Sequence, residues 1–408
     1  MNAFQTIDSQ LRRNLVVLFA TGLLFWSSMA SLLPTLPLYA EYIGANKQQI
    51  GIVMGSFAIG LLIFRPYLGK MADERSRKLV LMIGLSVAAL APLGYAVVKS
   101  VPMLMALRAF HGISIAAFTT AYSALVADMA PREKRGEVLG YMSLVNPVGM
   151  AIGPALGGYL QAKFGYVPLF FTSTAIATLG FLCTLQISNP ALIEAFPHQK
   201  NSEGSWQILF SPRVRVPAIV MLLVGLAFGT LSTFVPLFIK STRVNLNPGL
   251  FYTAAALTSF STRFITGKIS DRIGRGLFIT IGIACYSWSM FLLWQANTAT
   301  AFLVAGAIEG IGGGTMIPMI VAMMADRSYP QERGKIFALC VAGFDVGIAI
   351  AGPVFGAAAE SVGYRNMFAF AGILTLIAII VFVTQSSQDL SSSVRFALGK
   401  SKDSYALD

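Results

Sequence analysis

Arg108, His111, Glu309 and Asp345 are ionisable side chains that lie deep inside long apolar stretches of this sequence. A charge at the centre of a membrane helix costs roughly 2.5 to 3.5 kcal/mol on insertion scales, so such residues need partners or a function. Arg108 and His111 are three residues apart and share one helical face. A permanent cation beside an imidazole that titrates near neutrality is suited to proton sensing. The structural alternative is that Arg108 holds backbone carbonyls and His111 is a hydrogen-bonded packing residue.

The two carboxylates are the candidates for carrying a proton. A carboxyl group in an apolar surrounding can hold a proton at neutral pH. Glu309 occupies the same place in the second half of the chain as His111 in the first. We therefore assign proton coupling to Arg108, His111, Glu309 and Asp345. A purely hydrogen-bonding role is the alternative for both carboxylates.

Several short patterns recur at a fixed offset of 198 residues, which divides the chain into two similar halves. Gly69-x-x-x-Asp73, for example, recurs as Gly267-x-x-x-Asp271. Two homologous halves in a bilayer usually enclose a central site that opens to one side at a time. Charge pairs at these loops would lock one face through a modest, reversible energy difference. The alternative is a pair of solvated basic loops. The residues assigned to gating are Gly69, Asp73, Arg77, Asp128, Gly267, Asp271, Arg272, Arg275 and Asp326.

The elements that must position these residues are membrane helices. Hydrophobic residues make up 55% of the 408 residues and charged residues only 12%, against about a quarter charged in soluble domains. A helix needs about 20 apolar residues to cross the hydrocarbon core. The sequence predicts an all-α integral membrane protein of twelve transmembrane helices in two six-helix bundles. The predicted helices are 15–40, 48–68, 79–98, 102–127, 137–160, 166–187, 215–239, 249–267, 277–295, 299–325, 335–358 and 364–384.

The connections between these helices give the domain organisation and the orientation. We expect a bundle over 1–188, a cytoplasmic linker over 189–214, a second bundle over 215–385 and a cytoplasmic tail over 386–408. Most of the 30 Lys and Arg residues fall on the side that holds both termini, and such residues are retained on the cytoplasmic side. The Ser-rich tail is expected to be mobile or to lie along the membrane surface.

Over nearly its whole length the chain resembles the major facilitator superfamily, and within it the twelve-helix drug:proton antiporter branch. The segment Gly267 to Arg275 matches that family's G-x-x-x-D-R-x-G-R loop completely. The first copy departs at Glu74 and Ser76, where the family usually has Arg and Gly. The stretch from Leu104 to Gly112 resembles the family's helix 4 motif, with His111 in place of Gln. The resemblance implies transport by alternating access.

The predicted fifth helix carries glycines that are similar to the antiporter motif of exporters in this family. Their spacing is G-x8-G-x3-G-P-x2-G-G, and the resemblance favours export over import. Glycines four apart also make a groove for close helix contact, and a proline bends a helix, so packing alone is the alternative. The motif residues are Gly140, Gly149, Gly153, Pro154, Gly157 and Gly158.

The substrate is indicated only by class. Aromatic and amphipathic candidates for a cavity suit small lipophilic or amphipathic compounds, as in multidrug efflux, although such side chains more often serve packing. The alternatives are a dedicated exporter of a sugar, siderophore or lipid-like product, and a non-transporting sensor on the same fold. The cavity candidates are Trp26, Tyr122, Asn146, Phe228, Phe234 and Met319.

The remaining expectations concern function classes and partners. No nucleotide-binding or hydrolase motif is complete, so the chain is not expected to be an enzyme. Cys183, Cys285 and Cys340 show no metal-ligand spacing, and no metal or cofactor is expected. The expected partners are a small-molecule substrate, protons as energy source and the lipid bilayer, without nucleic acid. We expect a monomer in a bacterial inner (plasma) membrane.

Overall fold

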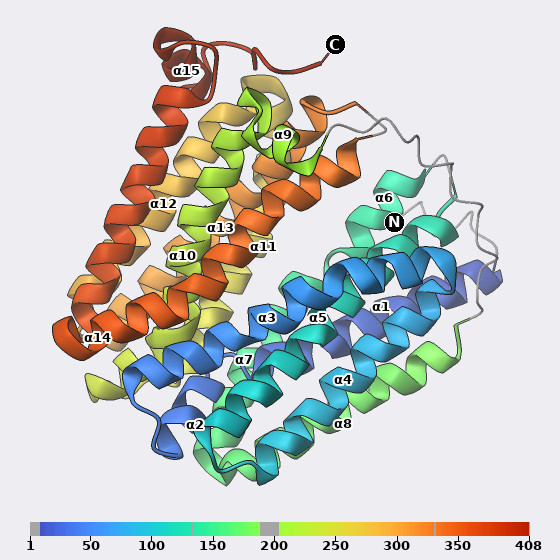
Figure 1. Cartoon of the computed structure of the whole chain (residues 1–408), viewed down its shortest axis with the longest axis vertical. Coiled ribbons are helices and arrows are strands. Elements are labelled where there is room, and N and C mark those ends of the chain that lie inside the picture. The colour runs from blue at the N-terminus through green and yellow to red at the C-terminus, as the bar shows by residue number, and fades with distance from the viewer. Residues whose placement is uncertain (1–8, 132–133, 188–203, 330–331, 408) are drawn as a thin grey trace. The chain divides into compact units, whose positions relative to one another are not determined.

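The structure is a computed structural model that describes residues 9–131, 134–187, 204–329 and 332–407. Long helices account for nearly all regular structure in these residues (Figure 1). They group into two compact units, of which the first contains Ile52–His198 and the second Leu250–Asp408 as their longest segments. Met1–Ala45 and Asn247–Gly249 belong to the first unit, and Asn46–Gly51 and Gln199–Leu246 to the second.

Among the described residues, eight helices precede the linker. Two of the expected membrane helices are each interrupted once, between α1 and α2 and between α6 and α7. The bounds are α1 Ser9–Ser31, α2 Leu36–Tyr42, α3 Lys47–Glu74, α4 Arg77–Val97, α5 Val101–Met129, α6 Arg135–Met142, α7 Val145–Phe164 and α8 Tyr166–Leu185.

Seven helices follow. Most of the expected linker lies outside the described residues, and its end forms the short helix α9. The bounds are α9 Ser205–Phe210, α10 Pro212–Ser241, α11 Pro248–Ile273, α12 Arg275–Gln295, α13 Ala299–Asp326, α14 Arg333–Gln385 and α15 Leu390–Ala397.

The prediction of an all-α membrane fold is confirmed. Ten helical segments of the described residues are long and apolar enough to cross a membrane. One of them, α14, has 53 residues and contains a non-helical corner at Gly363, so it supplies two crossing segments. The helix α11, which ends in several charged residues, occupies the position expected for the remaining one. The helices thus follow the twelve expected positions.

Both units turn the same kind of corner between their last two membrane helices. Gly165 separates α7 from α8 with φ 87°, and Gly363, 198 residues later, divides α14 with φ 77°. Positive φ is strained for residues that carry a Cβ, so glycine serves here.

Helix packing also repeats between the units. A Cβ on Gly84 of α4 would lie 2.9 Å from the Phe118 nitrogen of α5. A Cβ on Gly282 of α12 would lie 2.9 Å from the Met316 nitrogen of α13. Both pairs are related by the 198-residue offset. The repeat therefore includes sites at which neighbouring backbones approach closely.

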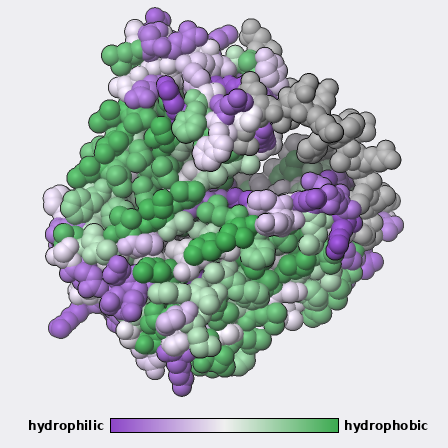
Figure 2. Space-filling view, viewed as in Figure 1, coloured by the Kyte–Doolittle hydropathy of each residue, from purple (hydrophilic) through white to green (hydrophobic). Residues whose placement is uncertain are grey.

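The segment after Gln385 was expected to be mobile or to lie along the membrane surface. It forms α15, which packs beside α12 and α14, and the residues after α15 also contact the second unit (Figure 1). Its Phe396 and Ala397 are buried. Hydrophilic side chains gather over α15 and the tail, whereas hydrophobic residues cover the flank of the helices below them (Figure 2). Buried apolar residues therefore hold this Ser-rich segment against the helices.

Candidate functional site

The first candidate site is a buried cluster around α5. His111 is fully buried and Arg108 is 8% exposed. The Tyr95 hydroxyl of α4 lies 2.9 Å from His111 Nδ1 in a hydrogen bond whose direction depends on the imidazole tautomer. The Arg108 guanidinium lies 4.3 Å from the ring centre of Phe57 on α3. A cation over an aromatic face is an attractive contact when both groups are shielded from water.

The cluster is held by a close crossing of α3 and α5. A Cβ on Gly112 would lie 1.9 Å from the Phe57 carbonyl oxygen, so only glycine fits there. Among the described residues, Arg108 Nε and His111 Nε2 have no hydrogen-bond partner. A buried polar atom without a partner is uncommon and calls for a functional explanation. The Arg108 Nε–H can therefore donate to a ligand, and His111 Nε2 can bind a proton or a ligand.

The second candidate site lies on α13, at the position that corresponds to His111. Glu309 is 7% exposed. The hydroxyls of Tyr252 on α11 and Tyr286 on α12 are within electrostatic range of its carboxylate. Among the described residues, the buried Tyr286 hydroxyl has no hydrogen-bond partner. Gly310 repeats the close crossing, since a Cβ on it would lie 1.9 Å from the Ala255 carbonyl oxygen.

Asp345, the other proposed proton carrier, has a different setting. It is half-buried on α14, and it is already engaged in a polar or electrostatic interaction. Glu309 is therefore the more deeply buried of these two carboxylates.

Among the gating residues whose side chains the structure describes, one ion pair is present in each unit. Arg77, at the start of α4, pairs with Asp128 at the end of α5, and it also donates a 2.9 Å hydrogen bond to the Ala124 carbonyl. Arg275, at the start of α12, lies 2.8 Å from Asp326 at the end of α13. These are the same two positions at the same offset. We call them the first and the second gate pair.

The other gating residues are placed differently from the sequence interpretation. The helices α3 and α11 continue to Glu74 and Ile273, so Gly69, Asp73 and Gly267 lie in the last helical turns and not in loops. Asp73 is exposed.

Gly69 makes no close helix contact with the described residues. A Cβ there would meet only Thr120 Cγ2, at an ordinary distance of 3.9 Å. No heavy atom of the described residues lies within 4 Å of a Cβ on Gly267. The side chains of Asp271 and Arg272 lie outside the described residues.

The glycines of the exporter-like motif lie in α6 and α7. Three of them face the backbone of α1: a Cβ on Gly149, Gly153 or Gly157 would come within 3.0 Å of atoms of Trp26 to Ser31. Gly140 lies in α6, and a Cβ there would meet no described atom within 4 Å. Packing against α1 is thus a sufficient structural reason for the three central glycines, and Pro154 lies inside α7 between them. Gly158 is also buried on α7.

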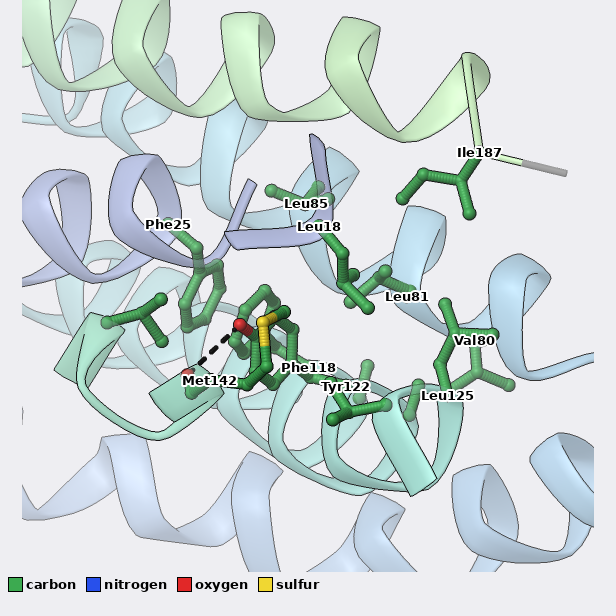
Figure 3. Close-up of a cluster of buried hydrophobic side chains, with 14 of the residues drawn as sticks. Leu18, Phe25, Val80, Leu81, Leu85, Phe118, Tyr122, Leu125, Met142 and Ile187 are labelled. Atoms are coloured by element: carbon green, nitrogen blue, oxygen red, sulfur yellow. Dashed lines mark hydrogen bonds between the residues drawn. The ribbon is translucent and has the colours of Figure 1, made fainter. Parts of the chain in front are cut away.

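Several proposed cavity residues belong to packed cores. Tyr122 stacks on Phe118, which stacks on Phe25 with ring centres 3.7 Å apart. The Tyr122 hydroxyl donates to the Met142 carbonyl, a bond drawn in Figure 3.

In the second unit Phe234 is fully buried and Met319 is 5% exposed. The more accessible candidates, each of intermediate exposure, are Trp26, Asn146 and Phe228.

The sequence interpretation missed three residues that the structure places at or near these sites. Tyr95 and Tyr286 come from neighbouring helices, and no spacing within one segment links them to His111 or Glu309. Arg327, a fully buried cation, follows the second gate pair. The sequence repeat could have pointed to Arg327, because the corresponding position of the first half holds the apolar Met129.

Comparisons with known proteins agree with this architecture. A model of the Major Facilitator Superfamily matches residues 18–294 and, in a second match, 245–398. The chain is 28% identical over 396 residues to the multidrug resistance protein MdtG of Proteus mirabilis (strain HI4320), covering 90% of this chain and 94% of that one. It is 25% identical over 385 residues to MdtG of Citrobacter koseri, with the same coverage.

Two solved structures show the same fold. A point mutant of the nucleoside transporter NupG superposes with a TM-score of 0.76 at 14% identity, covering 90% of this chain and 98% of that one. A bacterial homologue of the human lysosomal transporter Spinster gives a TM-score of 0.74 at 14% identity, with 95% and 97% covered.

Proposed function

Because the chain belongs to the major facilitator superfamily, we propose that it exports small lipophilic or amphipathic compounds in exchange for protons. It is a multi-pass membrane transporter and not an enzyme. The substrate class, the proton coupling, the monomeric state and the cytoplasmic location of both termini form part of the proposal.

Glu309 is the observation that carries this proposal. Its carboxylate is almost fully buried in an apolar helix bundle, where a permanent charge is costly. Tyr252 and Tyr286, from two neighbouring helices, interact with it electrostatically. A carboxyl group so placed can take up a proton in one conformation and release it in another. His111 at the corresponding position gives the first unit a second titratable group.

The direction and the substrate class have separate support. The glycine pattern of α6 and α7 is similar to that of exporters, and the similar proteins named above are called multidrug resistance proteins. Trp26 and Phe228 offer accessible aromatic surface, which binds apolar compounds by contact area more than by hydrogen bonds. In this scheme a proton moves inward as a compound moves outward. The gate pairs hold one face of the transporter closed while the other face is open.

Transport into inside-out vesicles tests the proposal. With an acidic lumen, vesicles that contain the wild type should accumulate a lipophilic dye such as ethidium or a bisbenzimide, and a protonophore should abolish this accumulation. Glu309→Gln should lower gradient-driven accumulation by about tenfold or more, because the variant cannot release a proton. It should still pass dye down the dye's own gradient. The matched control is Glu137→Gln, since Glu137 is exposed on α6.

Two results would reject the proposal. Unchanged accumulation by Glu309→Gln would remove this residue from coupling. Failure of the wild type to accumulate any compound of a broad lipophilic panel would favour a dedicated metabolite exporter or a sensor.

A further inference from the structure

The residue that follows the second gate pair is a buried cation. Arg327 comes directly after Asp326 at the end of α13, and its side chain has no exposed surface. Burying an arginine is costly unless its charge is paired and its donors are satisfied. The position 198 residues earlier holds Met129, which is 8% exposed. The first unit therefore fills this place with an apolar side chain, and the second unit fills it with a charge.

The C-terminal tail supplies the partner of this charge. Arg327 Nε and Nη2 donate to the two carboxylate oxygens of Asp403 at 2.7 and 2.9 Å. Its Nη1 donates to the Arg213 carbonyl at the start of α10, and its Nη2 to the Ser386 carbonyl at the end of α14. The Tyr405 ring centre lies 5.1 Å from the guanidinium carbon. One side chain thus joins three helix ends to the tail.

The rest of the tail is packed as closely. A Cβ on Gly276 of α12 would lie 2.2 Å from the Phe396 carbonyl oxygen, so α15 rests directly on that helix. The Thr280 hydroxyl donates to the Ala397 carbonyl at 3.0 Å. Beyond α15, the Leu407 amide donates to the Asp326 carbonyl at 2.8 Å. The tail returns to the residue that forms the second gate pair.

Asp326 is therefore held from two sides. Its side chain pairs with Arg275, its carbonyl accepts the bond from Leu407, and its neighbour Arg327 is clamped by Asp403. We propose that Arg327 and residues 386–407 form a strap that positions Asp326 for its ion pair with Arg275. The proposal rests on the proposed function in one respect, namely that this pair takes part in gating.

The test is a double-mutant cycle on Arg327 and Asp403. Asp403→Asn leaves a buried arginine without its countercharge and should lower both thermal stability and transport, the latter by about tenfold. Arg327→Met introduces the residue found in the first unit and should still fold, with lowered thermal stability, because it leaves the Asp403 carboxylate, whose side chain is 10% exposed, without its countercharge. In the Arg327→Met background, Asp403→Asn should change transport by less than about twofold, because the partner is already gone. Lys402→Gln is the matched control, since Lys402 is exposed beside Asp403.

A distance measurement separates positioning from mere stability. Spin labels at Ile273 and Tyr329, both exposed, report on the second gate pair in a background without native cysteines. Arg327→Met should widen the distance distribution and slow transport by about two- to fivefold, although the protein remains folded. The proposal is overturned if Arg327→Met matches the wild type in both readouts, if Asp403→Asn has no effect, or if the two changes act additively.

The same measurement distinguishes failure of the strap from failure of proton coupling. Glu309→Gln should leave the distance between residues 273 and 329 unchanged while it removes the response to the proton gradient. Strap variants should alter this distance and keep the proton dependence of the transport that remains.

Discussion

The two units solve the same packing problem and differ in where they place charge. Gly112 crosses Phe57 in the first unit as Gly310 crosses Ala255 in the second, and a Cβ added at either glycine would lie 1.9 Å from the facing carbonyl oxygen. One helical turn away, at Gly60, a Cβ would lie 1.8 Å from the Ala109 carbonyl oxygen. The second unit has Thr258 there, whose hydroxyl donates to Ala307 at 2.8 Å.

The charges follow no such symmetry. Arg108 of the first unit corresponds to Gly306, His111 to Glu309, and Met129 to Arg327. The gate pairs, in contrast, keep their residue types. The repeat therefore preserves the backbone contacts, whereas the buried ionisable groups are specific to each unit. The buried ionisable residues of one unit can therefore differ without any change in the helix packing of the other unit.

The largest expected effect tests the shared crossings. Gly112→Ala and Gly310→Ala should each destabilise the protein by about 3 kcal/mol or more, because the added methyl meets a backbone carbonyl that cannot move aside. Thermal unfolding in detergent, together with the yield of monodisperse protein, measures this. Gly140→Ala is the control, since no described atom would contact a methyl at that position. Tolerance of alanine in one unit alone would show that the two crossings are not equivalent.

The gate pairs should differ in strength. The Asp128 side chain is 10% exposed, and that of Asp326 is 40% exposed. Asp128→Asn should therefore cost about 1.5–3 kcal/mol, as for a hydrogen bond to a charged group in a shielded place. Asp326→Asn should cost only about 0.2–1 kcal/mol, as for an exposed ion pair. Unfolding midpoints at low and high salt would measure the difference, and equal costs would contradict the argument from burial.

The smallest expected effect concerns the N-cap residues of two helices. The Ser76 hydroxyl accepts from the Leu79 amide at the start of α4, and Asp389 accepts from the Ser392 amide and hydroxyl at the start of α15. Ser76→Ala should cost about 1 kcal/mol at any pH.

Hydrogen bonds from Ser392 lower the pKa of Asp389 below its usual value. Its stabilising contribution is therefore present above the unfolded-state pKa and is lost as the pH falls through the folded-state pKa. Hydrogen exchange of α15, corrected for the intrinsic effect of pH, should quicken in acid for the wild type and show no such change in Asp389→Ala. A pH response that persists in the variant would assign it to another group.

The fold was predictable from the sequence because a bilayer fixes the length and the polarity of each helix. The 198-residue offset also marked Arg77, Asp128, Arg275 and Asp326 as related positions before their contacts were known. The offset could not show that Arg77 forms its ion pair with Asp128, because this pairing depends on where the two helices end in space. The proposed roles of Arg108, Glu309 and Asp345 remain predictions.

The side chains that contact the buried ionisable groups were not predictable, because they come from other helices. Tyr95 reaches His111 from another helix, and the rotation of one helix against its neighbour leaves no mark on the spacing within either segment. The packing of the tail was not predictable from its serine-rich composition, because Phe396 and Asp403 carry its contacts. An alignment of the sequences of the two halves would have shown that Arg327 corresponds to Met129, a charged residue in the place of an apolar one.

The glycine corners have a consequence for how the chain enters the bilayer. Only Gly165 stands between the end of α7 and the start of α8, and Gly363 makes the equivalent corner in α14. Helices joined by a single residue cannot be delivered one at a time with a long polar loop between them. We expect each pair to pass into the membrane as one hairpin during biogenesis, so an epitope inserted at either corner should disturb insertion itself, whereas one placed after Ala397 should not.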